Sequence, residues 1–233
     1  MAFQFSPKIV SDGLVLYLDA ANSKSYPGTG LTWSDLSRYG NNGTLTPGGS
    51  GLTFNSSNGG SLVFDGVDDY VETNKTITTS NSSYSLGIWA KSSSTGISNR
   101  PVGNADGSNG LTGMDIIWGY PNPNNVYAVR RAGLNNGTLD TYIAVNNLLT
   151  QWHYIMVTYN HTSIGTVMYA DGVSAGTNTN LGFTCNLPFR IGRDGAAVQS
   201  FTGQISVVQI YNRALSASEV LQNYNATKSR FGL

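Results

Sequence analysis

Glutamates that could act in acid–base chemistry are few, because the chain holds only two, Glu72 and Glu219. Hydrolysis of a glycosidic bond needs two carboxyl groups about 5 to 9.5 Å apart. Asp68, Tyr70 and Glu72 share one face of a predicted strand, which is the closest approach to such a pair. Glu219 follows Ser216 at the spacing of a helix capping box, which is a structural role. We therefore expect the chain not to be an enzyme.

The two histidines raise a second kind of catalysis, since a Ser/His/Asp triad needs a positioned imidazole. His153 follows Trp152 in the apolar stretch WHYIMVTY, and His161 lies in the turn after that stretch. The sequence has no Gly-x-Ser-x-Gly elbow that would place a nucleophile. We expect structural or surface roles for both histidines.

Aromatic and planar polar side chains are concentrated between residues 118 and 131. Sugar recognition uses an aromatic face for stacking and planar polar groups beside it. One interpretation is that this segment binds carbohydrate, and the alternative is that its aromatic residues fill the core around a Pro/Asn turn. The candidate carbohydrate-binding residues are Trp118, Tyr120, Asn122, Tyr127 and Arg130.

Short strands separated by turns must position these residues. Residues 84–90 alternate at the two-residue period of a strand, and an Asp-Gly turn at 171–172 follows a clear strand pair. The capping box at Ser216 predicts one helix that ends near Ala226. The strands expected are 14–18, 52–54, 62–64, 70–72, 84–90, 114–118, 126–130, 139–145, 152–159, 166–169, 189–191 and 204–211.

Many strands, one helix and no strand–helix alternation predict an all-β fold. We expect a two-sheet antiparallel jelly-roll sandwich with one short C-terminal helix. Residues 1–10 are expected to form an N-terminal arm, residues 11–226 the jelly-roll domain, and residues 227–233 a C-terminal tail.

Composition narrows the classes of partner. Charged residues make up 11% of the 233-residue chain and the formal net charge is zero, so we expect no nucleic-acid partner. No apolar stretch approaches the roughly 18 residues that span a bilayer, and we expect no membrane insertion. The N-terminus lacks the pattern of a signal peptide. The single cysteine, Cys185, excludes a disulfide within one chain.

Six segments occur in a recognisable order. The chain carries SLVFDGVDDYVET, SYSLGIWAK, WHYIMVTYN, GTVMYADGVSAGT, PFRIGR and FTGQISVVQIYNRALSASEV. This order resembles the laminin-G-like domains of the concanavalin A-like lectin/glucanase superfamily, from about Gly13 to Tyr224. The resemblance implies a concanavalin A-like sandwich, a fold that carries lectins, glycosidases and structural modules.

The same resemblance implies a calcium ion in many members, held by acidic residues and main-chain carbonyls near a sandwich rim. The calcium candidates here are Asp65, Asp68 and Asp69. Members often have two further acids in a late strand, where this chain has Ser206 and Val207 instead. Calcium takes six to eight oxygen ligands, so this loss leaves no firm cofactor.

The opening GLVLYLDAANSKSYPGTGLTWSDLSRYGNNGTL and the ending NRALSASEVLQNYNATKSRFGL look like laminin-G-like proteins of tailed bacteriophages. This implies a non-enzymatic virion structural, decoration or fibre protein, made in the host cytoplasm and located in the virion. Its expected partners are other virion proteins, further copies of itself and host surface glycans. The alternatives are a free carbohydrate-binding lectin module or a glycoside hydrolase. The candidate assembly contacts are Phe3, Phe5, Phe231 and Leu233.

Overall fold

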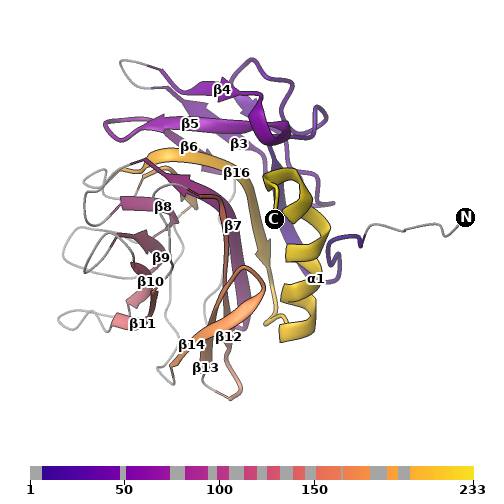
Figure 1. The fold of residues 1–233 in the computed structure, drawn as a ribbon, viewed down its shortest axis with the longest axis vertical. Helices are drawn as coiled ribbons and strands as arrows, with labels where there is room; N and C mark the ends of the chain where they lie inside the picture. The colour runs from indigo at the N-terminus through magenta and orange to yellow at the C-terminus, as the bar shows by residue number, and fades with distance from the viewer. Residues whose placement is uncertain are drawn as a thin grey trace, which may run out of the picture.

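The fold is taken from a computed structural model (Figure 1). The structure describes residues 7–47, 51–73, 82–93, 99–104, 113–119, 125–131, 139–144, 151–163, 165–178, 188–193 and 200–233. Strands within these residues form two sheets, here named sheet A and sheet B, and every strand pair is antiparallel. The predicted two-sheet antiparallel sandwich with a single short C-terminal α-helix is confirmed.

Sheet A is built from strands of both halves of the chain. They are β1 (Leu14–Asp19), β4 (Thr53–Asn55), β5 (Ser61–Asp65), β7 (Tyr84–Ser92), β12 (His153–Asn160), β13 (Gly165–Ala170), β14 (Val173–Asn178) and β16 (Thr202–Tyr211). Their order is β14-β13-β12-β7-β16-β5-β4, and β1 also pairs with β16.

Sheet B packs against one face of sheet A. Its strands are β2 (Thr32–Trp33), β3 (Gly43–Thr46), β6 (Tyr70–Thr73), β8 (Asn99–Gly103), β9 (Gly113–Trp118), β10 (Asn125–Arg131), β11 (Leu139–Ala144) and β15 (Arg190–Ile191). Their order is β11-β10-β9-β8-β15-β6-β3-β2. The chain also forms the 3₁₀ turns η1 (Ser57–Gly59) and η2 (Lys228–Phe231) and the helix α1 (Ala217–Thr227).

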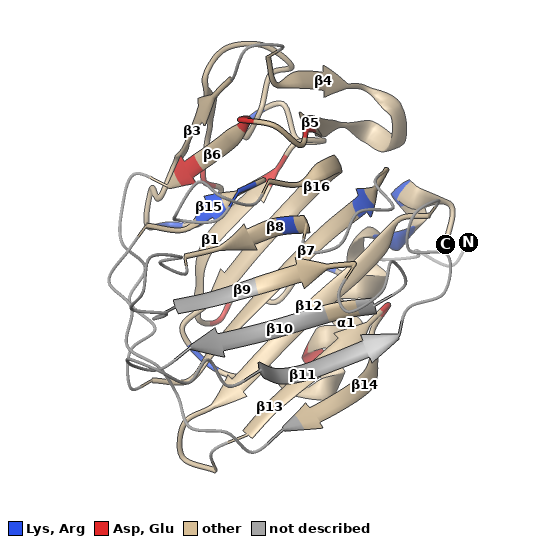
Figure 2. Ribbon diagram, turned by 90° about the vertical axis from the view of Figure 1, so that its left-hand side faces the viewer, with Lys and Arg blue, Asp and Glu red and all other residues tan. Residues whose placement is uncertain are grey.

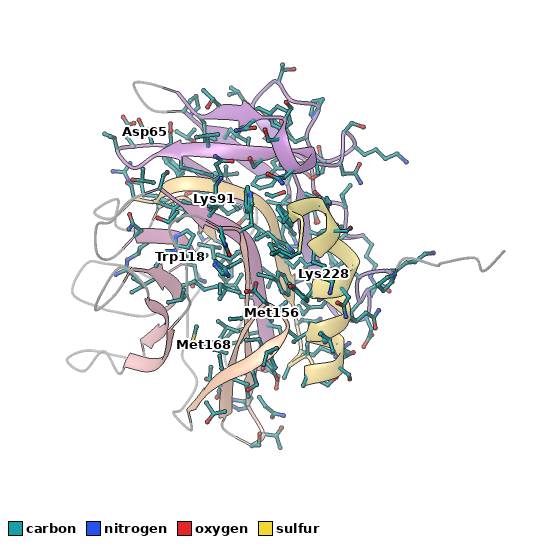
Figure 3. The ribbon with its side chains drawn as sticks, viewed as in Figure 1. Asp65, Lys91, Trp118, Met156, Met168 and Lys228 are labelled. Atoms are coloured by element: carbon teal, nitrogen blue, oxygen red, sulfur yellow. The ribbon has the colours of Figure 1, made fainter. Side chains whose placement is uncertain are left out.

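The core between the sheets follows from the alternation that the sequence shows. On β7, Leu86 and Ile88 point into this inter-sheet core, whereas Trp89 points to the other face of sheet A. Successive side chains of a strand alternate between faces, so one strand supplies both layers. Figure 3 shows Met168 between the sheets and Met156 on the opposite side of sheet A, toward α1.

The second apolar cluster lies between sheet A and the C-terminal segment, and we call it the helix-side core. Its centre is an aromatic group in which Trp89 stacks on Phe231, with ring centroids 4.2 Å apart, and on Tyr224 at 5.7 Å. Trp152 lies 4.8 Å from Phe231. The indole Nε1–H of Trp89 donates to Thr227 Oγ1 at 2.7 Å, so the buried indole N–H has a hydrogen-bond acceptor. Sheet A is thus buried on both faces along β7 and β12.

This arrangement corrects one prediction about the C-terminus. Phe231 was expected to contact other proteins, but it is buried in the chain's own helix-side core. Apolar residues near a chain end look exposed in a sequence because their partners are distant in that sequence. Leu233 is 47% exposed, and its proposed role in assembly stays a prediction. Phe3 and Phe5 lie outside the described residues.

The N-terminal segment is hydrogen-bonded to α1. The main-chain N–H of Val10 donates to Asn223 Oδ1 at 2.8 Å, and Gln222 Nε2 donates to the carbonyl of Lys8 at 2.7 Å. Figure 1 shows this segment and the C-terminus on the helix side of sheet A, away from sheet B. Among the described residues, no helix has both the length and the apolar character needed to cross a membrane.

Candidate functional site

Strand β6 presents polar side chains on the outer face of sheet B. Val71 and Thr73 are buried, and the alternate residues Tyr70 and Glu72 are partly exposed. The prediction that Tyr70 and Glu72 share a strand face is confirmed. Asp68 precedes the strand, so it is not part of that row.

Strand β15 brings Arg190 onto this face, because Arg190 is the register partner of Glu72. Its Nε lies 2.6 Å from Glu72 Oε2, and its guanidinium carbon lies 5.1 Å from the centroid of the Tyr70 ring. The side chains of Arg190 and Glu72 are 24% and 37% exposed. We call Tyr70, Glu72 and Arg190 the Tyr70 cluster. Figure 2 looks onto this sheet, with a basic residue on β15 beside an acidic residue on β6.

The neighbouring strand adds a hydroxyl to this surface. Thr44 of β3 is the register partner of Glu72 and is exposed. The face therefore combines an aromatic ring, a guanidinium, a carboxylate and a hydroxyl group. Such groups can bind a sugar, since the ring contacts C–H groups while the ion pair accepts from and donates to hydroxyls.

Both glutamates of the chain are paired with arginines. Glu72 holds Arg190, and Glu219 lies at the start of α1, where Arg213 Nη1 donates to its Oε2 at 3.0 Å. Hydrogen bonds from Arg213 and from Ser216 lower the pKa of Glu219 to about 2. The general acid of a glycosidase needs a raised pKa, which is the opposite condition. The expected capping box of Ser216 and Glu219 is confirmed.

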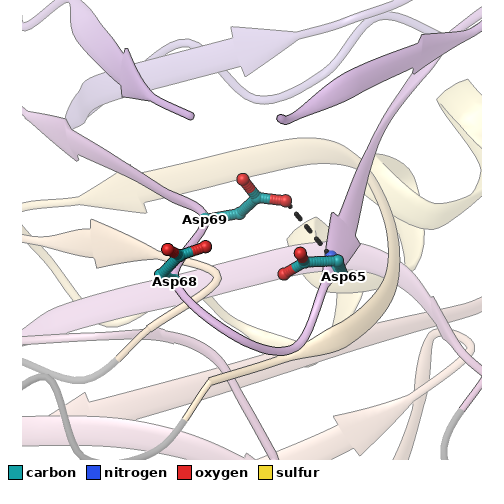
Figure 4. A group of neighbouring side chains, drawn as sticks. All are labelled: Asp65, Asp68 and Asp69. Atoms are coloured by element: carbon teal, nitrogen blue, oxygen red, sulfur yellow. Dashed lines mark hydrogen bonds between the residues drawn. The ribbon is translucent and has the colours of Figure 1, made fainter. Parts of the chain in front are cut away.

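Three carboxylates gather in the turn that leads from β5 of sheet A to β6 of sheet B (Figure 4). One oxygen from each of Asp65, Asp68 and Asp69 lies within 4.8 Å of the others. Asp69 Oδ2 accepts from the main-chain N–H of Asp65 at 3.3 Å, and Asp65 Oδ1 accepts from that of Val67 at 2.8 Å. The carboxylates therefore also shape the turn.

The acidic turn fits a calcium ion in part. The spacing of the three carboxylates suits a cation, but calcium takes six to eight oxygen ligands. The late strand supplies no carboxylate to it. Ser206 donates its hydroxyl to the carbonyl of Gly60, and Val207 is buried in the helix-side core. The remaining ligands would have to be main-chain carbonyls or water.

Of the residues proposed from sequence to bind carbohydrate, Trp118 is the one whose side chain the structure describes. Trp118 is fully buried in the inter-sheet core, 6.2 Å from the ring of Phe201, and Figure 3 shows it between the sheets. A buried indole offers no face to a sugar, so this part of the prediction is corrected in favour of its alternative. Tyr120 and Asn122 lie outside the described residues, as do the side chains of Tyr127 and Arg130 on β10.

Arg190 is a member of the Tyr70 cluster that the sequence analysis did not identify. It lies in PFRIGR, which was expected to be a strand, but nothing local to that segment indicates a partner. Its pairing with Glu72, 118 residues earlier, depends on the neighbourhood of β15 and β6 in sheet B. The one local signal is a charged residue at a strand position that could face outward.

His153 fits the structural role expected from the sequence. It is buried, and its Nδ1 lies 2.8 Å from Asp171 Oδ2 in the turn between β13 and β14. Asp171 has the left-handed φ of 52°, and its Oδ1 accepts from the main-chain N–H of Tyr154 at 2.9 Å. The pair thus fixes a tight turn against β12. His161 lies in the exposed turn after β12.

Comparison with protein families gives a match over most of the chain. A family model described as the concanavalin A-like lectin/glucanases superfamily matches residues 65–221. A search of curated proteins finds no match.

Solved structures extend the likeness across the fold. The binding domain of Paraclostridial Mosquitocidal Protein 1 is similar with a TM-score of 0.66 and 16% identity, over 92% of this chain and 52% of that chain. The binding domain of botulinum neurotoxin DC, in complex with SialylT, has a TM-score of 0.65 and 14% identity, over 93% and 52%. This chain thus spans about half the length of those binding domains.

One further structure is similar over its whole length. It is domain 4 of AbnA, a GH43 extracellular arabinanase from Geobacillus stearothermophilus, in complex with arabinotriose. The TM-score is 0.63 and the identity 18%, over 92% of this chain and 100% of that one. At such identities the likeness shows the fold alone.

Proposed function

The chain belongs to the concanavalin A-like lectin/glucanase superfamily, and from this premise we propose that it is a non-enzymatic module that binds carbohydrate through the outer face of sheet B. The observation that carries the proposal is the Tyr70 cluster. A half-buried aromatic ring, a guanidinium and a carboxylate lie within contact of one another, beside an exposed threonine.

The cluster is arranged before any ligand arrives. The ion pair of Arg190 and Glu72 fixes the guanidinium over the Tyr70 ring, so the polar groups do not have to be ordered on binding. Ordering a side chain at an interface costs about 0.5–1.5 kcal/mol, and prior arrangement removes part of that cost.

Two similar structures support a carbohydrate ligand. Domain 4 of the arabinanase is in complex with arabinotriose, and it corresponds to this chain over its full length. The neurotoxin binding domain is in complex with SialylT. These ligands belong to those proteins, and for this chain they favour a sugar over other ligand classes without naming which sugar.

A binding role without catalysis agrees with the state of the acids. Glu72 is held by an arginine at 2.6 Å, and Glu219 caps a helix. Each of these carboxylates is thus already engaged with a partner within the chain. We therefore propose no hydrolytic activity, and expect none to be lost on Glu72→Gln.

We further propose that the module is carried on a virion as a decoration or fibre protein, with other virion proteins and copies of itself as partners and host surface glycans as its target. The described N-terminal segment and the C-terminus lie on the helix side of sheet A (Figure 1). The Tyr70 cluster lies on the outer face of sheet B. Attachment through the helix side would leave the Tyr70 cluster free to meet a glycan.

The glycan proposal is tested on an array of immobilised glycans. We expect the wild-type chain to bind, Tyr70→Ala and Arg190→Gln each to lose at least tenfold in affinity, and Lys24→Gln to bind as wild type. Lys24 is an exposed basic residue outside the cluster, so it controls for the loss of one positive charge. Retained binding in both cluster variants would contradict the proposed face.

The assembly proposal is tested separately by light scattering of the purified chain. We expect a discrete oligomer whose mass does not change with a chelator. A monomer at all accessible concentrations would contradict self-assembly and would favour the free lectin module.

A further inference from the structure

The loop that connects β2 and β3 of sheet B is organised by one carboxylate, that of Asp35. Its Oδ1 accepts from the main-chain N–H groups of Tyr17 at 2.8 Å and Ser37 at 2.9 Å. Its Oδ2 accepts from the Ser37 hydroxyl at 2.6 Å and from the N–H of Asn41 at 2.8 Å. The Asn41 side chain in turn donates to the carbonyl of Val15 on β1 at 2.7 Å. These hydrogen bonds fix the loop to β1 of sheet A.

This loop presents a cation and an aromatic ring at its tip. The guanidinium of Arg38 is exposed and donates from Nη2 to the Tyr39 hydroxyl at 3.1 Å. Its carbon lies 5.2 Å from the Tyr39 ring centroid, and Tyr39 is 39% exposed. Among the described residues, no carboxylate lies within ion-pair distance of Arg38. The charge of Asp12 acts on Arg38 from farther away, but Asp12 Oδ2 is held 2.8 Å from Arg213 Nε.

A cavity lies beside Arg38. Its volume is about 460 Å³, and its walls are the turn Ser11–Leu14 and the loop Leu36–Arg38. Two leucines, Leu14 and Leu36, are among the lining residues, as are two serines, Ser11 and Ser37. A volume of this order lies within the range of small-ligand pockets, roughly 300–1,000 Å³.

We propose that this edge pocket is a second ligand site, which binds a carboxylate-bearing ligand of the size of one acidic sugar residue. Arg38 pairs with the carboxylate, for which the planar guanidinium offers two parallel N–H donors. Leu14 and Leu36 contact the C–H groups of the ligand.

The charges around the pocket favour a single negative charge. Asp12 lines the pocket and its side chain is 86% exposed, so a dianion such as phosphate would meet stronger repulsion than a carboxylate. A neutral sugar would leave the Arg38 cation without a counter-charge. The fixed loop also lowers the entropy cost of binding, because Arg38 and Tyr39 are presented by an ordered backbone.

This site is distinct from the Tyr70 cluster, since the two share no residue. The proposal thus goes beyond the function proposed above. The edge pocket could bind its ligand even if the Tyr70 cluster bound nothing. Failure of the edge-pocket proposal would likewise leave the proposal for the Tyr70 cluster unchanged.

The test is calorimetric titration of the full chain with glucuronate, glucose and acetate as probes. We expect glucuronate to bind at least tenfold more tightly than glucose or acetate, and the affinity to fall as salt is raised. Arg38→Gln should weaken glucuronate binding at least tenfold, and Arg38→Lys should recover only part of it. Lys24→Gln, which removes one exposed positive charge outside both proposed sites, is the matched control and should bind glucuronate as wild type.

Three results would overturn the assignment of a carboxylate site beside Arg38. They are no heat of binding for glucuronate at millimolar concentrations, equal binding by wild type and Arg38→Gln, and equal affinity for glucuronate and glucose. Equal affinity for acetate would overturn the sugar-sized ligand, because the leucine contacts would then contribute nothing. Unchanged thermal unfolding of Arg38→Gln, expected because the side chain is exposed, shows that the variant is folded.

Discussion

The outer face of sheet A is covered by the C-terminal helix, whereas the outer face of sheet B carries the partly exposed Tyr70 cluster. Both faces carry aromatic residues, but the residues that surround them differ. On sheet A, Trp89 is enclosed by Phe231, Tyr224 and Tyr154. On sheet B, the Tyr70 ring meets a guanidinium and lies next to a carboxylate.

The difference separates packing from recognition. An aromatic residue enclosed by other aromatic residues contributes mainly by removing apolar surface from water, so its loss lowers stability. An aromatic residue beside partly exposed charged groups is only partly covered by the chain, so the uncovered part of its ring can contact a ligand. The same residue type therefore stabilises the fold on one face and is available for binding on the other.

The largest expected effect comes from the helix side. Phe231→Ala removes a ring that stacks on Trp89 and contacts Trp152, so the free energy of unfolding should fall by about 3 kcal/mol. Urea unfolding measures it, with Leu233→Ala as the control, which should cost less than about 0.5 kcal/mol because Leu233 is exposed. Equal effects of the two substitutions would show that the C-terminal segment is not part of the core.

A second, smaller effect concerns the ion pair that ties η2 to β1. Arg230 donates to both oxygens of the buried Asp19 carboxylate, at 2.7 and 2.9 Å, and Tyr17 donates its hydroxyl to the same group at 2.8 Å. Burial and the nearby Asp19 charge raise the pKa of Tyr17, so this hydroxyl stays protonated. Arg230→Gln should destabilise the chain by about 2 kcal/mol, because it leaves a buried charge short of a partner.

A double-mutant cycle sharpens that prediction. If the cost comes from the unpaired Asp19 charge, Asp19→Asn in the Arg230→Gln background should cost less than it does in the wild type. Purely additive effects in urea unfolding would mean that the two side chains act independently, and η2 would then be held by its aromatic contacts alone.

These two faces also show how far the sequence leads. The fold could be predicted because its signals are local. The two-residue alternation along β7 and the capping box at Ser216 each need only a few neighbouring residues, and both are present in the structure. The sequence could not decide between core and surface for Trp118 and misplaced Phe231, because the residues that bury them, Phe201 and Trp89, are far away in the sequence.

The sequence predicted only part of the candidate site. The alternation on β6 placed Tyr70 and Glu72 on one face, which local spacing is enough to show. Arg190 completes the cluster only because β15 pairs with β6, and the order of strands in a sheet is a long-range property. The edge pocket depends likewise on Asp35 reaching across to β1.

The third prediction concerns pH and again belongs to the helix side. Arg213 and Ser216 lower the pKa of Glu219 from its usual 4.5 to about 2. Because the folded pKa is the lower one, this carboxylate stabilises the fold above about pH 4.5, and the stabilisation is lost as the pH falls from about 4.5 to 2. After allowance for solvent screening we expect about 1 kcal/mol. Glu219→Gln should flatten the acid limb of stability against pH, and an unchanged limb would contradict this.

The smallest expected effect on stability is that of Tyr70→Ala, which tests the open face directly. A cation–π contact at an exposed site is worth about 0.5–1 kcal/mol, and the ring is only partly buried, so we expect a loss of about 0.5 kcal/mol in urea unfolding. The contrast with Phe231→Ala decides what the Tyr70 cluster is. A variant that keeps its stability and loses glycan binding identifies a recognition surface. A loss of stability as large as that of Phe231→Ala would make the cluster part of the framework, and the two faces of the sandwich would no longer differ in kind.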